Sequence, residues 1–524
     1  MRNILILLCA TSILASDETP RVIIIGAGAS GIAAAAKLFR NGIDNVTILE
    51  AEDRIGGRVY SVEMEEYDVD LGAQWVHGEG KNVVYEMAWP FHLLSHCLGP
   101  NDGSIFFKTA FKALARTVGS EKEAAILMRR NSIKFFLSTG EKMNDKTGRS
   151  LITFAMNLTA EWPGVENLRT GSVGEYFDRK INDYFNKHED IPEDLKIPLV
   201  KMVHRAHMAE NGAEDLYQAS AKADGDYFSD GDQQLNWKTG TYGIILDLLM
   251  RKYPDPEEEL PIVNSTLFNK KVSRIEYKGD GPVKVKTSDG DVYMADCVIF
   301  TPSLGVLKAN HKNLFVPHLP PSKINAIEHI GMGHVGKIYL YYDEPWWTKD
   351  LSNFYRFLIW TEDDEKELAS DPERRWMLSV YTVNRIEWKP KLICLWLTGP
   401  NIREMELLPK ELVRDQSLWL LDKFFGKFYN LTEPTEMLRT HWNSNDNFLG
   451  TYSWMSLDAE AHNATVSDLA EPIMQRDGRT PAIMFAGEAT SDFYSTVHGA
   501  IGSGWREAER IIDIKKRSSH WTQG

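Results

Sequence analysis

The sequence predicts an α/β fold in which short buried strands alternate with helices. Val22–Ile25 is a run of β-branched residues, which is typical of a strand buried on both faces. Glycines follow at positions 26, 28 and 31, and the alanine-rich residues 32–39 then favour a helix. A second apolar run, Val46–Leu49, ends at Glu50. This order of strand, glycine-rich turn, helix, strand and acid predicts a Rossmann-like dinucleotide-binding unit.

Each part of this pattern has a physical role in nucleotide binding. Gly26 permits the tight turn after the strand, and Gly28 lets the backbone approach a pyrophosphate. Gly31 allows close packing of helix on strand, while the N-terminus of the helix faces the phosphates. Glu50 can accept hydrogen bonds from ribose hydroxyls.

Length and composition describe an ordinary globular protein with more than one domain. The chain has 524 residues, of which 43% are hydrophobic and 25% charged. Its 74 acidic residues outnumber its 59 Lys and Arg residues, which argues against nucleic acid as a partner and is compatible with a cationic substrate. No group of Cys and His residues has the spacing of a metal site, so no metal is predicted.

The first sixteen residues have the features of a secretory signal. Arg2 is followed by an apolar stretch over residues 4–10 and then by small residues up to Ser16. We therefore expect a secreted protein with no membrane-spanning segment after signal removal. Five Asn-x-Ser/Thr sequons fit secretion and are potential glycosylation sites: Asn45, Asn157, Asn264, Asn430 and Asn463. Outside the signal, the three cysteines Cys97, Cys297 and Cys394 allow one disulfide at most.

Three further motifs resemble the flavin-dependent amine oxidases. The first is Arg54-Ile-Gly-Gly-Arg58, and the second is the segment from Asp70 to Gly78, which reads DLGAQWVHG. The third is the C-terminal series that runs through Gly487-Glu488 and Tyr494-Ser-Thr-Val-His-Gly. With histidine at position 77, the chain resembles the animal polyamine oxidases, namely spermine oxidase and N1-acetylpolyamine oxidase. The resemblance covers residues 21–512.

The resemblance implies FAD as cofactor and assigns residues to it. Residues 441–452 contain no cysteine, unlike the segment that tethers FAD in monoamine oxidases, so the flavin should be non-covalent. The implied cofactor-binding residues are Gly26, Gly28, Ser30, Gly31, Glu50, Arg58, Gly72, Ala73, Gln74, Trp75, Val272, Glu488, Thr496 and Val497.

The resemblance also implies the catalytic and substrate-binding residues. Lys337 matches the lysine that holds a water against flavin N5, and His77 matches a histidine that contacts a substrate nitrogen. A lysine near the start of a buried strand is costly to place unless it has partners. The implied substrate-binding residues are Trp75, His77, Tyr452, Tyr494 and Thr496.

The expected domains alternate along the chain. After the signal at 1–16, residues 17–98, 231–330 and 441–515 should form a Rossmann-like FAD-binding domain, with a tail at 516–524. Residues 99–230 and 331–440 should form a substrate domain of mixed sheet and helices. Within these segments, residues 293–300 and 376–381 are expected to be strands, and His204 and His207 are expected to serve helix packing or the surface.

The function expected from these residues is oxidation of a polyamine by O2. The products would be an aldehyde, a shorter amine and hydrogen peroxide. Two alternatives remain: another secreted flavin amine oxidase such as an L-amino-acid oxidase, and a catalytically weak flavoprotein that acts as a binding protein. The first would need an arginine that faces the substrate carboxylate.

Overall fold

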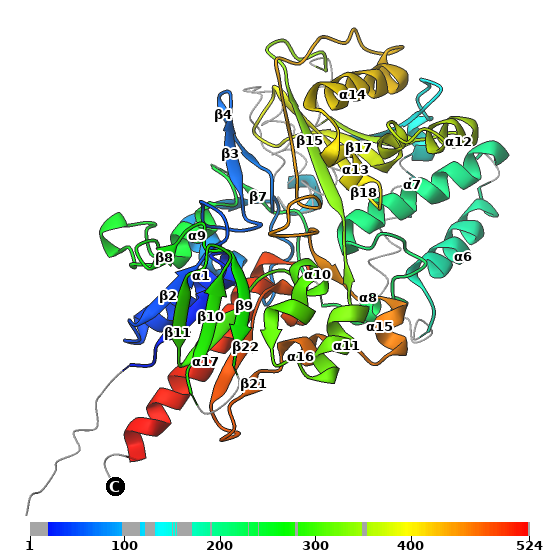
Figure 1. The fold of residues 1–524 in the computed structure, drawn as a ribbon. Coiled ribbons are helices and arrows are strands. Elements are labelled where there is room, and N and C mark those ends of the chain that lie inside the picture. The colour runs from blue at the N-terminus through cyan, green and yellow to red at the C-terminus, as the bar shows by residue number, and fades with distance from the viewer. Residues whose placement is uncertain are drawn as a thin grey trace, which may run out of the picture.

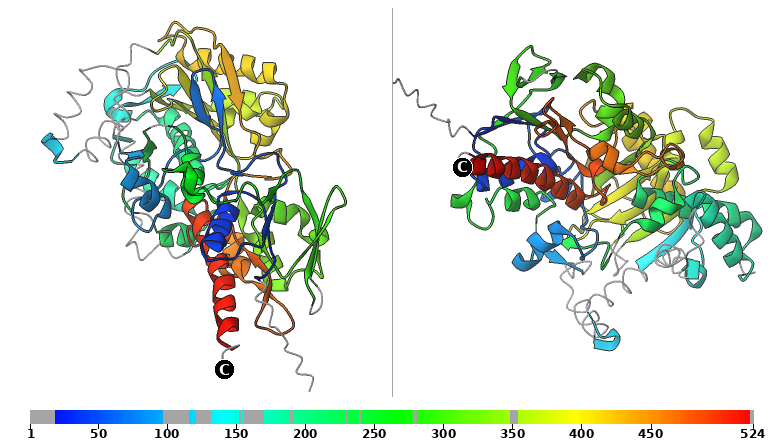
Figure 2. Two further views of the ribbon diagram at one scale, coloured as in Figure 1. Left: turned by 90° about the vertical axis from the view of Figure 1, so that its left-hand side faces the viewer. Right: turned by 90° about the horizontal axis from the view of Figure 1, so that it is seen from below.

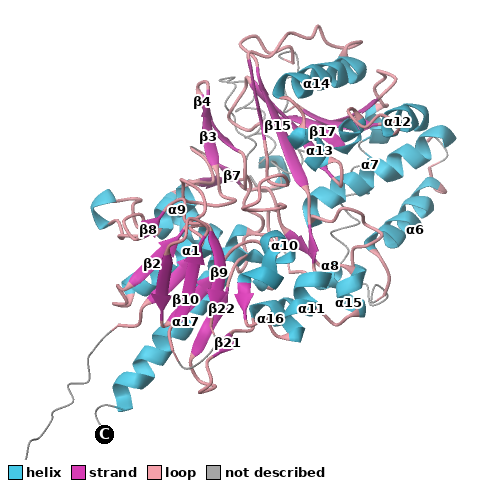
Figure 3. Ribbon diagram, viewed as in Figure 1, coloured by secondary structure: helices cyan, strands magenta, loops and turns pink. Residues whose placement is uncertain are grey.

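The structure is a computed structural model, and it describes residues 19–96, 116–120, 132–148, 150–151, 154, 170–188, 191–228, 230–238, 240–277, 281–347 and 354–521. The expected signal, Cys97 and the sequon at Asn157 lie outside these residues. The fold is mixed α/β with several sheets, and its two largest sheets lie in separate parts of the molecule (Figures 1 and 3).

The first large sheet has six strands in the order β21-β22-β12-β1-β2-β8. All neighbours pair in parallel except β21 with β22. The strands are β1 (Val22–Ile25), β2 (Val46–Leu49), β8 (Thr266–Leu267), β12 (Cys297–Phe300), β21 (Ile473–Met474) and β22 (Pro481–Phe485). Strands β1, β12 and β22 are buried throughout, as their apolar runs predict.

Two long helices lie side by side on this sheet. Helix α1 (Ala29–Arg40) follows β1, and α17 (Val497–Trp521) ends the described chain (Figure 2). A Cβ added at Gly504 of α17 would lie 2.1 Å from the carbonyl oxygen of Ser30 in α1, so the backbones are in direct contact. Helix α17 continues to Trp521, so residues 516–521 of the expected tail are helical.

A four-stranded sheet lies beside the first and corrects one sequence prediction. Its order is β11-β10-β9-β13, with β9 (Val272–Glu276), β10 (Val283–Thr287), β11 (Val292–Ala295) and β13 (Phe315–Val316). Residues 293–300 were expected to form one buried strand. Instead the chain leaves β11, turns at Asp296 and enters β12 of the other sheet. The exposed side chains of Val292 and Met294 mark the first part as a surface strand.

The second large sheet has the order β19-β15-β18-β17-β16-β6. It is antiparallel apart from the pair β16 and β6. The strands are β6 (Ile133–Leu137), β15 (Val335–Tyr341), β16 (Tyr355–Ile359), β17 (Val380–Arg385), β18 (Leu392–Thr398) and β19 (Glu436–Arg439). The strand expected over residues 376–381 begins only at Val380, because Arg375–Ser379 forms the 3-10 helix η3.

Helices and short strand pairs complete the described structure. Three strand pairs are β3 (Ser61–Met64) with β4 (Tyr67–Asp70), β5 (Leu94–Ser95) with β7 (Asn236–Trp237), and β14 (Gly331–Met332) with β20 (Ser453–Trp454). The remaining helices are α2 (Val83–Ala88), α6 (Val173–Phe185), α7 (Glu193–Asn211), α8 (Ala221–Asp226), α9 (Ile244–Leu249), α10 (Leu304–Leu314), α11 (Pro321–His329), α12 (Glu362–Ala369), α13 (Ile402–Leu407), α14 (Lys410–Phe425), α15 (Leu457–Ala461) and α16 (Val466–Ala470). The 3-10 helices η1, η2 and η4 span Trp89–Phe91, Pro256–Glu258 and Glu488–Thr490.

The two described cysteines, Cys297 and Cys394, are buried in different large sheets, and both are free thiols. Cys297 is therefore the small buried residue that its apolar strand predicts. Within the described ranges, no helix combines the length and the apolar composition needed to cross a bilayer.

Candidate active site

A cavity of about 1020 Å³ is lined by residues of both large sheets. It extends from the end of β1 and the start of α1 to Lys337 on β15 and Trp396 on β18. Ligand pockets for one small molecule are usually smaller than this. The space therefore suits a large cofactor together with a substrate.

One end of the cavity is built around the N-terminus of α1. Gly28 is the N-cap, and no side chain caps the first turn, so the first N–H groups of the helix are available to a ligand. Gly26 has φ +99°, a conformation that favours glycine. Gly31 does not line the cavity. A Cβ at this position would lie 2.0 Å from the carbonyl oxygen of Gly26, so the helix and the turn are in direct contact here. Its role is close packing of helix on turn.

Glu50 stands at the end of β2 beside this helix. Its carboxylate accepts from the backbone N–H groups of Ala27, at 2.6 Å, and Glu52, at 2.8 Å. Burial raises the pKa of Glu50, although the two N–H groups oppose that shift. A carboxylate fixed between the turn and the strand end fits the ribose of a nucleotide.

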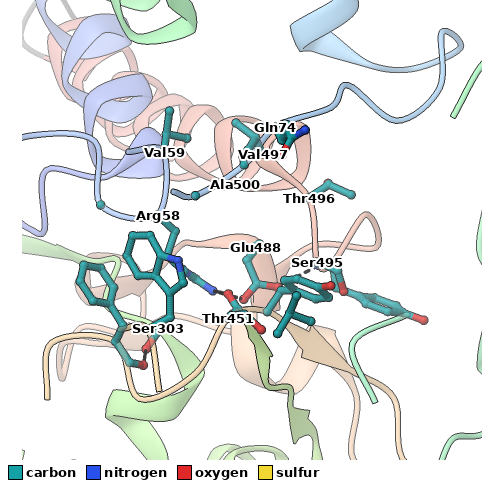
Figure 4. A pocket seen from close by; sticks show the side chains of 18 of the residues that line it. Arg58, Val59, Gln74, Ser303, Thr451, Glu488, Ser495, Thr496, Val497 and Ala500 are labelled. Carbon is teal, nitrogen blue, oxygen red and sulfur yellow. Dashed lines mark hydrogen bonds and ion pairs between the residues drawn. The ribbon is translucent and has the colours of Figure 1, made fainter. Parts of the chain in front are cut away.

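Arg58 and Glu488 meet at the centre of the site, although 430 residues separate them in the sequence. Their ion pair measures 3.0 Å, and Arg58 also donates to the backbone carbonyl of Thr451. The other carboxylate oxygen of Glu488 accepts from Ser453 Oγ at 2.7 Å and from the Ser495 N–H at 2.8 Å. Figure 4 shows Arg58 and Glu488 pointing toward each other, with Ser495 beside them. Glu488 thus joins its own segment to the segments of Arg58 and Ser453.

Three buried donors on residues that line this cavity have no partner within the described protein. They are Gln74 Nε2 and Trp75 Nε1, next to Gly72 and Ala73, and Trp396 Nε1. Because a buried donor without a partner costs free energy, these groups fit a bound molecule that carries acceptor atoms. The ring oxygens and nitrogens of a flavin are such acceptors.

Lys337 lies on β15 with its side chain buried at 4% exposure. Its Nζ donates to the backbone carbonyls of Asp70, at 2.9 Å, and Gly72, at 2.8 Å, and to Gln74 Oε1 at 3.1 Å. The sequence predicts that a lysine in this buried strand needs hydrogen-bond partners, and these three acceptors provide them. Burial lowers the pKa of Lys337 to about 8, against the opposing charge of Asp70.

His77 is an exposed residue that lines the cavity further along. The Nδ1 atom lies 2.6 Å from the carbonyl oxygen of Gln233, which can only accept, so the hydrogen is on Nδ1. Partial desolvation of the ring by the protein lowers the pKa of His77. The imidazole is therefore neutral near pH 7, and its Nε2 lone pair can accept from an amine.

Aromatic rings form the walls between Lys337 and His77. Trp75 stacks on Trp396 with ring centroids 5.1 Å apart, and the Lys337 ammonium lies 4.6 Å from the Trp396 ring. Tyr494 contacts Tyr227 edge to face at 4.9 Å. Tyr452 also lines the cavity and is held by a hydrogen bond from its hydroxyl to the carbonyl of Ala209. Such walls hold an apolar chain and can face a cationic group.

Beyond these rings lies an acidic group of residues that sequence reasoning missed. His207 of α7 lines the cavity, with Nδ1 3.2 Å from Glu210 and Nε2 3.3 Å from Asp224 of α8. Burial disfavours the charged imidazole, but the two carboxylates outweigh it and raise the pKa of His207 to about 10. His207 therefore does more than the expected helix packing, because it also holds two carboxylates beside the cavity. His204 of α7 fits the packing expectation, because its Nε2 lies 3.0 Å from a carboxylate oxygen of Asp178 in α6.

The cavity brings together all the predicted site residues except Gly31. Val272, Thr496 and Val497 line it with the residues described above, and Figure 4 shows Thr496 and Val497 at the start of α17. Sequence reasoning also missed His498. Its pKa is lowered to about 4 by burial and by the nearby His77. Neither Cys297 nor Cys394 lines the cavity.

Comparison with known proteins places this chain in a family. The family model described as flavin containing amine oxidoreductase matches residues 29–512. The chain belongs to this family. FAD is its cofactor and is held without a covalent bond, and the protein is an FAD-dependent amine oxidase. The uncapped helix, Glu50 and the unpartnered donors of Gln74 and Trp75 fit that cofactor.

Among curated proteins, the chain is similar to polyamine oxidases over almost its whole length. It is 27% identical to the peroxisomal N(1)-acetyl-spermine/spermidine oxidase of Bos taurus, over 97% of this chain and 98% of that protein. The protein of the same description from Homo sapiens is 26% identical, over 94% and 95% of the two chains. Polyamine oxidase 1 of Zea mays is 27% identical, over 98% and 94%.

Proposed function

We propose that this protein is a secreted oxidase of polyamines. It would oxidise spermine, spermidine or their acetyl derivatives with O2 to an aldehyde, a shorter amine and hydrogen peroxide. The observation that carries the proposal is the placement of Glu210 and Asp224 on the cavity wall beyond the aromatic rings. With His207 charged, the two carboxylates leave this group with one net negative charge, which attracts a remote ammonium.

The proposed domain arrangement follows the two large sheets. Residues 17–98, 231–330 and 441–515 supply the first sheet and would form a Rossmann-like FAD-binding domain. Residues 99–230 and 331–440 supply the second sheet and would form the substrate domain. The cavity takes residues from both parts, which is the arrangement that a cofactor and a substrate require.

Bound FAD supplies an acceptor for the hydride on the carbon next to the reacting nitrogen. The chain's own residues prepare that amine. Neutral His77 offers a lone pair to an amine N–H, and the apolar walls of Trp75, Tyr452 and Tyr494 exclude water, which favours the uncharged amine needed for hydride loss. Lys337 would act in the oxygen reaction, where its charge would stabilise developing negative charge while its three hydrogens are held by Asp70, Gly72 and Gln74.

The cavity offers little to the carboxylate of an amino acid. Among the described lining residues Arg58 is the sole arginine, and it is committed to Glu488 at 3.0 Å. An L-amino-acid oxidase needs a guanidinium or equivalent cation that is free to bind the substrate carboxylate. The acidic group around His207 would repel such a substrate. These contacts favour the polyamine.

Secretion rests on the N-terminal segment and on accessible sequons. The four sequons within the described residues, Asn45, Asn264, Asn430 and Asn463, are all exposed, as glycosylation requires. The relatives from Bos taurus and Homo sapiens are described as peroxisomal. Secretion would therefore separate this protein from them.

A peroxide assay on the purified flavoprotein tests the proposal. Spermine, spermidine, N1-acetylspermine, a monoamine of similar chain length and leucine are compared at equal concentration. We expect peroxide with at least one polyamine at a kcat/KM well above those of the monoamine and leucine. Turnover of leucine alone would establish the L-amino-acid oxidase alternative. Flavin that no amine reduces would establish the binding-protein alternative.

A further inference from the structure

Two histidines and an aspartate come together on the surface at the ends of α11 and α15. They are His329 at the C-terminus of α11, Asp458 in the first turn of α15 and His462, the C-cap of α15. One potential ligand atom from each residue lies within 4.8 Å of those of the other two. Asp458 and His462 are four residues apart, so they share one face of the helix. These residues do not line the active-site cavity.

Hydrogen bonds set the tautomer of both imidazoles. His329 Nδ1 lies 2.8 Å from the carbonyl oxygen of Asn325, and His462 Nδ1 lies 2.9 Å from the carbonyl oxygen of Asp458. A carbonyl oxygen only accepts, so each Nδ1 carries the hydrogen and each Nε2 keeps its lone pair. In a metal-bound histidine, the ring nitrogen that does not bind the metal commonly donates to a backbone carbonyl, which fixes the orientation of the ring.

The side chains are close to the separation that a metal ion needs. The two rings stack with centroids 3.8 Å apart, and His329 Nε2 lies 3.8 Å from an Asp458 carboxylate oxygen. Ligand atoms around a tetrahedral zinc ion are about 3.4 Å apart, from bond lengths of about 2.1 Å. The side chains of Asp458 and His462 are 62% and 49% exposed, so they can rotate by the small amount required.

We propose that His329, Asp458 and His462 form a binding site for a first-row transition metal ion of the Zn²⁺ type. Two imidazoles and one carboxylate suit such an ion, and the exposed side leaves a position for water. The sequence alone does not indicate this site, because His329 and Asp458 are far apart in the chain and meet only through packing of the two helices.

The ion would hold α15, which follows β20 in the chain, against α11. Ser456, just before α15, donates to the carbonyl oxygen of His329 at 2.6 Å, and Asn325 donates to the carbonyl of His462 at 3.0 Å. The same stretch continues from β20, where Ser453 donates to Glu488. A metal bridge between α11 and α15 would therefore reinforce the attachment of β20 without contacting the cavity.

The test uses the FAD-loaded protein without a histidine tag, stripped with a chelator. Equilibrium dialysis against Zn²⁺ with elemental analysis should find one tight ion per chain, and Zn²⁺ should raise the melting temperature. His462→Gln and Asp458→Asn should each weaken Zn²⁺ binding at least tenfold and abolish the melting shift. Both residues are largely exposed, so the variants should fold and keep their flavin.

His318→Gln is the matched control, because His318 is an exposed histidine outside the trio. It should bind Zn²⁺ as the unaltered protein does. The proposal is overturned if the unaltered protein takes up no tight Zn²⁺, or if His462→Gln and Asp458→Asn bind it as tightly as His318→Gln does. Absorption of the Co²⁺-loaded protein provides an independent measure, since the bands of nitrogen and oxygen coordination should disappear in His462→Gln.

Discussion

The ammonium nitrogen of Lys337 lies 2.8 Å from the carbonyl oxygen of Gly72, and this contact ties the second large sheet to the segment that follows β4. Through it a buried lysine is held beside Gln74 and Trp75, whose side-chain donors have no partner within the described protein. The contact explains how a charged group is kept in an otherwise apolar wall: backbone carbonyls of the neighbouring segment satisfy its hydrogens.

The first prediction concerns Lys337 and the oxygen reaction. Lys337→Met should slow flavin reoxidation by O2 on the order of 100-fold, because a positive donor at the site of developing negative charge is removed. Flavin reduction by amine should change far less. Anaerobic stopped-flow reduction, followed by mixing with oxygen, separates the two rates. Lys308→Met is the control, since Lys308 is a partly buried lysine outside the cavity.

The same residue should impose a pH dependence on reoxidation. Burial lowers the pKa of Lys337 to about 8, so the side chain is charged below that pH and neutral above it. Reoxidation of the unaltered protein should therefore be fastest below pH 8 and fall as the pH rises through it. The Met variant should lack this fall. A Met variant that reoxidises at the normal rate would remove Lys337 from the oxygen reaction.

The second prediction concerns flavin retention by Arg58 and Glu50. Arg58→Ala leaves the buried Glu488 without its cation, which costs about 3 kcal/mol. Glu50→Ala removes the carboxylate that holds the N–H groups of Ala27 and Glu52. Both variants should be purified with less FAD per chain, as measured by the ratio of flavin to protein absorbance.

The control for these variants needs a carboxylate in a surface turn away from the cavity. Asp289 does not qualify, because it pairs with Lys270, which lines the cavity. Asp477 accepts only from its own turn, at Arg479 and Thr480, and is exposed. Asp477→Ala should keep a full complement of FAD. Equal flavin loss in all three variants would mean that general destabilisation, not a cofactor contact, is being measured.

Much of the local structure around the N-terminus of α1 could be predicted from sequence, because its residues are close together in the chain and their conformations allow few alternatives. Gly26, Gly28, Gly31 and Glu50 lie within one strand-helix-strand unit, where the geometry allows few alternatives. The strand boundary at Asp296 could not be predicted in the same way, since residues 293–300 are apolar enough to read as one strand. Only the packing of two sheets shows that the chain changes sheet there.

The acidic end of the cavity could not be predicted for a different reason. Glu210 and Asp224 are two of 74 acidic residues and have no local motif. Their importance comes from the packing of α7 and α8 around His207, which places them on the cavity wall. A histidine that lies within four residues of another polar residue on a helix is by itself only a weak indication of a functional site.

The third prediction concerns secretion. Protein secreted by a eukaryotic host should begin near residue 17 and carry N-linked sugar on some of Asn157, Asn264, Asn430 and Asn463. Treatment with a glycosidase should lower its mass, and N-terminal analysis should find no Met1. An Asn264→Gln, Asn430→Gln and Asn463→Gln variant should show a smaller shift. Intracellular protein that retains Met1 and shows no shift would contradict the signal.

The fourth prediction concerns His77 and the amine. His77→Ala should weaken the binding of amine and its reduction of the flavin by ~1–3 kcal/mol, the cost of one lost hydrogen bond to a polar group. Because partial desolvation lowers the pKa of His77, the imidazole stays neutral near pH 7, and its contribution should be lost only in acidic solution. The reduction rate at low amine concentration measures both effects. Reoxidation by O2 should be unchanged, and a normal reduction rate in His77→Ala would exclude this role.

The last prediction uses substrate length to test the acidic end of the cavity. The side chain of Glu210 is 70% exposed, so its attraction for a remote ammonium is screened and worth about 1 kcal/mol. Glu210→Gln should therefore raise KM for spermine roughly fivefold at low salt while leaving kcat almost unchanged, because the contact is equal in ground and transition state. A monoamine has no second ammonium, so its kcat/KM should not change. High salt should reduce the difference between the unaltered protein and the variant. Glu214→Gln is the control, since Glu214 pairs with His334 and does not line the cavity. If Glu210→Gln affects spermine and the monoamine equally, the carboxylate acts through the structure of α7 and not through the substrate.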